Sequence, residues 1–196
     1  MSIFLDVLKV IHIVNAILLA WPFYALVAVN QRARLGPPLG DRADTYMENT
    51  IKNRTIPCFV FQATALITGL ALVLVRGFGL NALLKHPALG VKFLLLLLLI
   101  AGLLAYVHIS LQPRIDALFA GAGSNPVAKE VAPRIGALRL RRKRIASICL
   151  FGVLTISMLG VQAWSAFPLW LSGVLVLAIG VFTWRAYQSI TPYGWA

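Results

Sequence analysis

The sequence predicts an all-α protein, a polytopic membrane helical bundle with five transmembrane helices. Hydrophobic residues make up 60% of the 196 residues and charged residues 12%, about half the charged share of a soluble domain. Five apolar stretches reach roughly the 20 residues that a helix needs to cross a bilayer. The basic residues, which give a formal net charge of +12, gather mostly between these stretches. This composition excludes intrinsic disorder, which requires low hydrophobicity, and argues against a water-soluble globule.

The predicted spans form a single transmembrane domain over residues 1–196. They cover about residues 3–29, 56–75, 88–111, 145–163 and 167–187. The first carries Asp6 early and lacks a basic start, so we interpret it as a retained helix and not as a signal peptide. The third contains an unbroken run of leucines that cannot face water. The last two are so close in sequence that they predict an antiparallel hairpin, which adds a C-terminal fifth helix to a four-helix core.

The basic residues predict the orientation of the chain in the membrane. With five spans, the connections 30–55 and 112–144 lie on the same side as the C-terminus, and together with Arg185 they carry fourteen of the eighteen Lys and Arg residues. Lys52 and Arg54 are among the fourteen. Because basic residues are retained in the cytoplasm during insertion, we expect the N-terminus outside and the C-terminus in the cytoplasm. The localisation that follows is a cell membrane, expected to be the bacterial inner membrane.

A dense basic run occupies residues 139–144, directly before the fourth span. Such a run is typical of a topology determinant that also contacts anionic headgroups, each charge contributing about 1 kcal/mol near the surface. Binding of single-stranded nucleic acid would need aromatic residues interleaved with the charges, and this run contains none. We therefore expect the lipid bilayer, and no nucleic acid, as its partner.

Few ionisable residues lie inside the predicted spans, and each is a candidate functional group because burying it in lipid is costly. They are Asp6, Lys9, His12, Lys92 and His108. The deep parts of the spans carry no carboxylate, which disfavours a transporter with an Asp/Glu proton relay. Motifs of hydrolases, nucleotide-binding loops and zinc sites are also missing from the sequence.

His12 is the leading candidate for a metal or cofactor ligand. Neutral imidazole is the commonest metal ligand and a usual axial ligand of haem iron. Asn15 lies three positions further on and shares the helix face of His12. The structural alternative is a histidine that bonds to a neighbouring helix, as intramembrane polar residues often do.

Depth in the membrane separates the possible partners of His12. The rise of a helix places His108 about 15–20 Å deeper, so the two histidines cannot be the axial ligands of one haem. Lys92 lies in the outer turns of the third span, within reach of His12 if its side chain points inward. The alternative for Lys92 is snorkelling to the outer headgroups.

Two cysteines suggest a different metal. Cys58 and Cys149 lie in the inner turns of two spans, at about the depth of His108, and cuprous ion prefers soft ligands of this kind. Buried free cysteines more often behave as small hydrophobic residues. The sequence leaves both interpretations open.

Two segments carry a family resemblance. The segment LKVIHIVNAILLAWPFYAL (residues 8–26) resembles the first helix of the HemJ-type protoporphyrinogen oxidases, in which a histidine follows a Leu-Lys start. The segment HPALGVKFLLLLLLIAGLLAYVH (residues 86–108) resembles their third helix, where a lysine opens a leucine-rich span that ends in histidine. The resemblance implies that His12 and Lys92 are the essential pair, linked to b-type haem.

Two further segments, IPCFVFQATALITGLAL (residues 56–72) and SLQPRIDALFA (residues 110–120), are similar to a related family of predicted integral membrane proteins. Both families look like relatives of the CopD membrane domain. The resemblance covers residues 2–162 and gives the fifth helix no counterpart. VNQRAR (residues 29–34) stands where the oxidases have a Pro-Arg-Leu stretch.

Two hypotheses of function follow. In the first, the protein binds haem b and has a redox role, with His12 as an axial ligand that coordinates the metal. Lys92 would be a second ligand or a propionate partner, Asn15 an orienting group, and a protoporphyrinogen-like tetrapyrrole or a quinol the electron donor. In the second, the protein is a non-catalytic scaffold or accessory subunit. Its fifth helix would then dock another membrane subunit or a homo-oligomer partner through a face that includes Gly173 and Gly180.

Overall fold

The computed structural model describes residues 3–34, 39–51, 55–122, 127–162, 165 and 167–189. Their regular structure is entirely helical, and five helical stretches are long and apolar enough to cross a membrane. The prediction of an all-α, multi-pass chain is confirmed at this level. Lys52, Arg54 and Ala163, which the sequence assigned to a basic connection and to the end of a span, lie outside the described residues.

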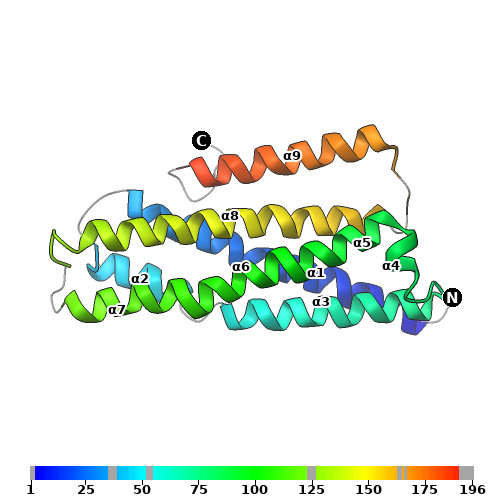
Figure 1. The fold of residues 1–196 in the computed structure, drawn as a ribbon, viewed down its shortest axis with the longest axis horizontal. Coiled ribbons are helices and arrows are strands. Elements are labelled where there is room, and N and C mark those ends of the chain that lie inside the picture. The colour runs from blue at the N-terminus through cyan, green and yellow to red at the C-terminus, as the bar shows by residue number, and fades with distance from the viewer. Residues whose placement is uncertain are drawn as a thin grey trace.

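The long helices lie side by side along the long axis of the molecule and alternate in direction (Figure 1). They are α1 (Ile3–Asn30), α3 (Thr55–Val75), a continuous third helix, α8 (Ala132–Gln162) and α9 (Leu169–Gln188). The third helix runs through α5 (Pro87–Leu94), η2 (Leu95–Ile100), α6 (Ala101–Tyr106), η3 (Val107–Leu111) and α7 (Gln112–Ala122). The N-terminus and the short α4 (Ala82–Lys85) mark one end of the bundle, here called the α4 end.

The opposite end, here called the α2 end, holds α7 and the short helix α2 (Arg42–Ile51). The predicted connection over 112–144 is largely helical, because α7 continues to Ala122 and α8 begins at Ala132. Hydropathy marks where a helix leaves the hydrocarbon, whereas the helix itself continues as long as its backbone bonds are made.

The core lies between α1, α3, the third helix and α8. Its buried residues include Phe23, Ile100, Leu104, Cys58 and Cys149. The fifth helix packs on the outer side of α8 and, of its described residues, contributes only Ala186 to this core, and Tyr24 of α1 stacks on Phe182 of α9 with 6.5 Å between ring centroids. The structure therefore has four central helices and one peripheral helix.

The proposed docking face of α9 is not wholly on the outside. A Cβ atom added at Gly180 would lie 3.7 Å from Phe151 of α8, whereas one added at Gly173 would meet nothing within 4 Å. Gly180 therefore faces α8 of its own chain, and the docking of a partner on this face stays a prediction.

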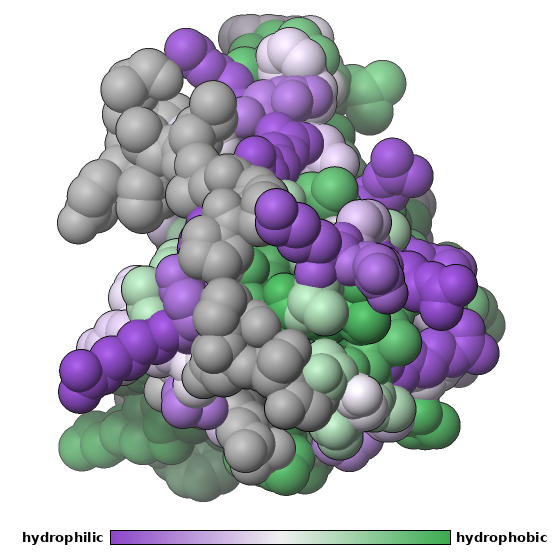
Figure 2. Space-filling view, turned by 90° about the vertical axis from the view of Figure 1, so that its left-hand side faces the viewer, coloured by the Kyte–Doolittle hydropathy of each residue, from purple (hydrophilic) through white to green (hydrophobic). Residues whose placement is uncertain are grey.

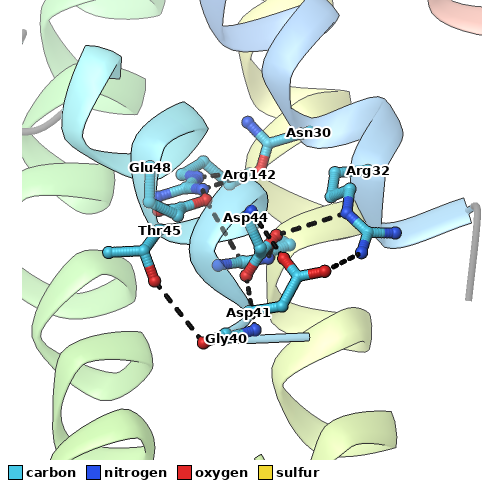
Figure 3. Close-up of polar contacts among 9 residues, drawn as sticks. Asn30, Arg32, Gly40, Asp41, Asp44, Thr45, Glu48 and Arg142 are labelled. Atoms are coloured by element: carbon cyan, nitrogen blue, oxygen red, sulfur yellow. Dashed lines mark hydrogen bonds and ion pairs between the residues drawn. The ribbon is translucent and has the colours of Figure 1, made fainter. Parts of the chain in front are cut away.

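Ion pairs between α2 and α8 are buried at the α2 end (Figure 3). The Arg139 guanidinium is 1% exposed and donates from Nη1 to Asp44 Oδ1 at 2.7 Å. The Arg142 guanidinium is 2% exposed and donates from Nη2 to Glu48 Oε1 at 2.6 Å and to Asn30 Oδ1 at 2.8 Å. Because burying a charge is costly without a partner, these pairs fix α2 against α8.

The whole run 139–144 was expected to face lipid headgroups, and this was wrong for Arg139, Arg142 and Lys143, which are buried. Arg141 and Arg144 are exposed. The run is helical, so successive residues point to different sides of α8, and only part of it can face outward. Figure 2 looks onto the α2 end and shows hydrophilic side chains gathered there beside apolar ones.

The buried Lys143 holds the C-terminal end of α9. Its ammonium donates to the Tyr187 carbonyl and lies 4.7 Å from the centroid of the Tyr187 ring. Arg34 of η1 (Gln31–Arg34) covers the same ring at 4.9 Å and donates to the Gln188 carbonyl at 3.2 Å. Cations are favoured at this position because the last carbonyls of a helix carry partial negative charge.

Removing the carboxylate of Asp44 tests the buried pairs. Asp44→Ala leaves Arg139 buried without this partner, and we expect the free energy of unfolding to fall by about 3–5 kcal/mol. Asp6→Ala is the control, because it breaks the ion pair of Asp6 with Lys9, in which the Asp6 side chain is 56% exposed. That loss should stay below about 1 kcal/mol. The measurement is reversible unfolding in detergent, and equal losses in the two variants would contradict the assignment.

Candidate functional site

His12 and Lys92 lie together near the α4 end of the bundle. The Lys92 ammonium, on α5, lies 3.1 Å from Nε2 of His12, on α1. The two residues are 80 positions apart in the chain. The structure thus brings together the pair that the sequence placed at similar depth.

The hydrogen bonds of Thr68 determine which nitrogen of His12 carries the proton. The Thr68 hydroxyl donates to the Thr64 carbonyl at 2.6 Å, so its oxygen is left to accept a bond from Nδ1 of His12 at 2.7 Å. Nδ1 is then protonated, and Nε2 keeps a lone pair that accepts from the Lys92 ammonium. His12 therefore presents an unprotonated Nε2 to the centre of the bundle.

Glycine at position 69 gives the His12 ring its space. A Cβ atom added at Gly69 would lie 3.3 Å from Cε1 of His12 and 3.7 Å from the ring of Phe93. On α8, a Cβ atom added at Gly160 would lie 3.1 Å from the Lys92 ammonium. The two glycines allow α3 and α8 to pass close to the polar pair.

Asn15 bonds between helices instead of lining the site. Its side chain is buried and its amide donates to the Phe61 carbonyl of α3 at 2.6 Å. It is not among the residues that line the cavity beside His12. Asn15 therefore positions α1 against α3, one turn away from His12.

A cavity of about 450 Å³ opens beside the pair, between α1, α3, α5 and α8. Its walls are mostly apolar and include Ala16, Leu96 and Val153. Its basic lining residues are Lys9, His12, Arg76 and Lys92, and none of the described residues that line it is Asp or Glu. The site is suited to an apolar body that carries negative charge at one end.

Sequence reasoning missed Thr68, Gly69 and Arg76 as parts of this site. Gln62, Ala65 and Gly69 share one side of the second span, and small residues at such spacing let helices approach closely. Thr68 directly precedes Gly69, so this spacing is the signal that the sequence offers for both residues. Nothing in the sequence alone, however, shows that this side of α3 faces His12.

His108 and the cysteines lie apart from the cavity. Nδ1 of His108 is 2.8 Å from the Thr55 hydroxyl, and its ring packs edge-on against Phe59. Cys58 and Cys149 are fully buried in the hydrophobic core. Among the described residues, no three His, Cys, Asp or Glu side chains are grouped so that they could hold a metal ion. The three residues therefore do not form the copper site considered from the sequence.

The Thr68 hydroxyl can be removed without changing the shape of the side chain. Thr68→Val leaves the Nδ1 proton of His12 without its acceptor, and we expect the free energy of unfolding to fall by about 1–3 kcal/mol. Thr64→Val is the matched control, because that hydroxyl bonds only to the Val60 carbonyl of its own helix. In ¹⁵N NMR spectra of the wild-type protein, His12 should be protonated at Nδ1. A wild-type ring protonated at Nε2 would contradict the arrangement.

Comparisons with known proteins found no matching family model, no similar curated protein and no similar solved structure. The resemblance to the HemJ-type oxidases and to CopD therefore stays a prediction from the sequence.

Proposed function

We propose that this chain is a membrane protein that binds b-type haem beside His12 and has a redox role similar to that of the HemJ-type protoporphyrinogen oxidases. The observation that carries the proposal is the pair of contacts that His12 makes. Its Nδ1 bonds to Thr68, and its Nε2 lies 3.1 Å from the Lys92 ammonium at the edge of a large apolar cavity.

The residues present fit a haem. Metal-binding histidines almost always donate their other ring N–H to an acceptor, as His12 does to Thr68. Haem iron takes one or two axial ligands from the protein, so it needs no group of three ligating side chains. The cavity of about 450 Å³ falls within the range of sites for small molecules and cofactors. When bound, haem would supply one-electron chemistry.

Each residue of the site has a role in this proposal. His12 would hold the haem iron through Nε2, and Thr68 would keep the His12 ring in the required tautomer. Lys92 lies in front of Nε2, so its flexible side chain would move aside and hold either the iron or a propionate. Arg76 adds positive charge to the cavity lining, and Lys9 lies there paired with Asp6. Asn15 acts on the site only through the position of α1.

We also propose the orientation predicted from charge, with the N-terminus outside, the C-terminus in the cytoplasm and the bacterial inner membrane as the location. The support is the distribution of basic residues, because the arginines of η1, α2 and the first turns of α8 all lie at the α2 end. In this orientation the His12 cavity lies in the outer half of the membrane.

The visible spectrum of the purified protein tests haem binding. After expression with haem precursors, the wild-type protein and His108→Ala should show a Soret band, and His12→Ala should lose it. Thr68→Val should lower haem affinity about 10–100-fold, the range typical when the partner of a metal ligand is removed. Elution as a monodisperse species shows that each variant is folded. A wild-type protein without a Soret band would overturn the proposal and leave the scaffold hypothesis.

Cysteine labelling tests the orientation. Both native cysteines are fully buried, so a membrane-impermeant thiol reagent should react little with the wild-type protein. We expect Arg141→Cys, at the α2 end, to react only from the cytoplasmic side. Leu84→Cys, at an exposed position of α4, should react only from outside. Labelling of Arg141→Cys from outside would reverse the orientation.

A further inference from the structure

The cavity beside His12 opens sideways, between α1 and α8. Four of its lining residues are also exposed: Ile13 is 59% exposed, Ile17 66% and Val161 51%, on α1 and α8, and Phe78, in the connection before α4, is 47% exposed. A residue that both lines a cavity and faces outward lies at an opening, so Ile13, Ile17 and Val161 mark the opening between α1 and α8. Leu96 and Val153 line the same cavity and are buried, so they mark its interior.

The packing of α1 explains the opening. In its first half α1 buries only Leu5 and Asn15, whereas its second half buries six residues between Leu19 and Asn30. The helix is therefore held tightly toward the α2 end and packs loosely toward the α4 end. None of the described residues of α9 lines the cavity, so the fifth helix does not close it.

The mouth is apolar, and the charge lies toward the α4 end. Isoleucine and valine form the opening, and both α1 and α8 are long and apolar enough to span a membrane. Arg76 and Lys92 supply positive charge, the Lys9 ammonium in the lining pairs with Asp6, and the described lining residues include no carboxylate. Charged groups in such low-dielectric surroundings attract an opposite charge more strongly than they do in water.

We propose that the cavity takes up a carboxylate-bearing amphiphile directly from the bilayer, through the opening formed by Ile13, Ile17 and Val161. Its acidic group lies against the basic residues, and its apolar body extends toward Leu96 and Val153. This inference rests on the proposed function only in that both place the ligand in the same cavity. Two possible ligands share this chemistry: haem itself, which carries two propionates, and a separate acidic amphiphile.

Photolabelling in liposomes tests the opening. A fatty acid with a diazirine at its tail, added to the protein in phosphatidylcholine liposomes, should label Leu96 and Val153. Val161→Trp and, independently, Ile17→Trp should abolish this labelling because they fill the opening. The control Leu177→Trp places the same bulk on an exposed position of α9 and should change nothing. The exposed Val174 should be labelled in every variant, which shows that each lies in the bilayer.

A second comparison tests the charge. Arg76→Gln should lower labelling of Leu96 by the fatty acid about fivefold, equivalent to about 1 kcal/mol, and should not affect a diazirine alcohol of equal length. Lys85→Gln, an exposed basic residue outside the cavity lining, is the control. If excess haemin suppresses the labelling, the cavity is assigned to haem. If the labelling persists in excess haemin, the cavity is assigned to a separate amphiphile.

These outcomes separate the inference from the proposed function. Labelling of Leu96 and Val153 in a protein that shows no Soret band supports the lateral opening and refutes the haem proposal. Wild-type protein without label at these two residues overturns the opening, and so does labelling that both tryptophan variants leave unchanged.

Discussion

The bundle depends on one constraint, that a polar group within hydrocarbon must find its partner inside the protein. Besides the bond of Lys92 with His12, three hydrogen bonds meet it between the central helices: His12 with Thr68, Asn15 with the Phe61 carbonyl, and Gln62 with the Leu96 carbonyl. Of these three, the first two join α1 to α3, and the last joins α3 to the third helix. These bonds set the spacing of the helices and therefore the position of the cavity beside them.

The two ends of the bundle meet this constraint differently. At the α2 end, Arg139 and Arg142 are paired with Asp44 and Glu48, and these ion pairs hold α2 against α8. At the α4 end, Lys92 faces a neutral imidazole, and no salt bridge within 4 Å reaches it from the part of the chain that the structure describes. The buried arginines of the α2 end are therefore held by carboxylates, whereas Lys92 at the α4 end offers positive charge to a ligand.

The five spans were predictable from the sequence because the thickness of the hydrocarbon sets the length of each apolar run. The proximity of His12 and Lys92 was also predictable, since helical rise converts sequence position into depth. The contact between Asp44 and Arg139 was not, because it depends on how α2 and α8 are rotated about their axes. For the same reason, the sequence alone does not show that Thr68 faces His12, where the cavity opens, or that Lys143 is buried.

Pulsed EPR of the ferric, haem-loaded protein labelled with ¹⁵N-histidine tests the central claim most directly, because it detects a nitrogen bonded to the iron. The chain has three histidines, so the ligand can be identified by replacing each in turn. The account predicts a histidine nitrogen coupling that His12→Gln abolishes and that His86→Gln and His108→Gln retain. Haem bound without a histidine coupling, or a coupling that persists in His12→Gln, would contradict it.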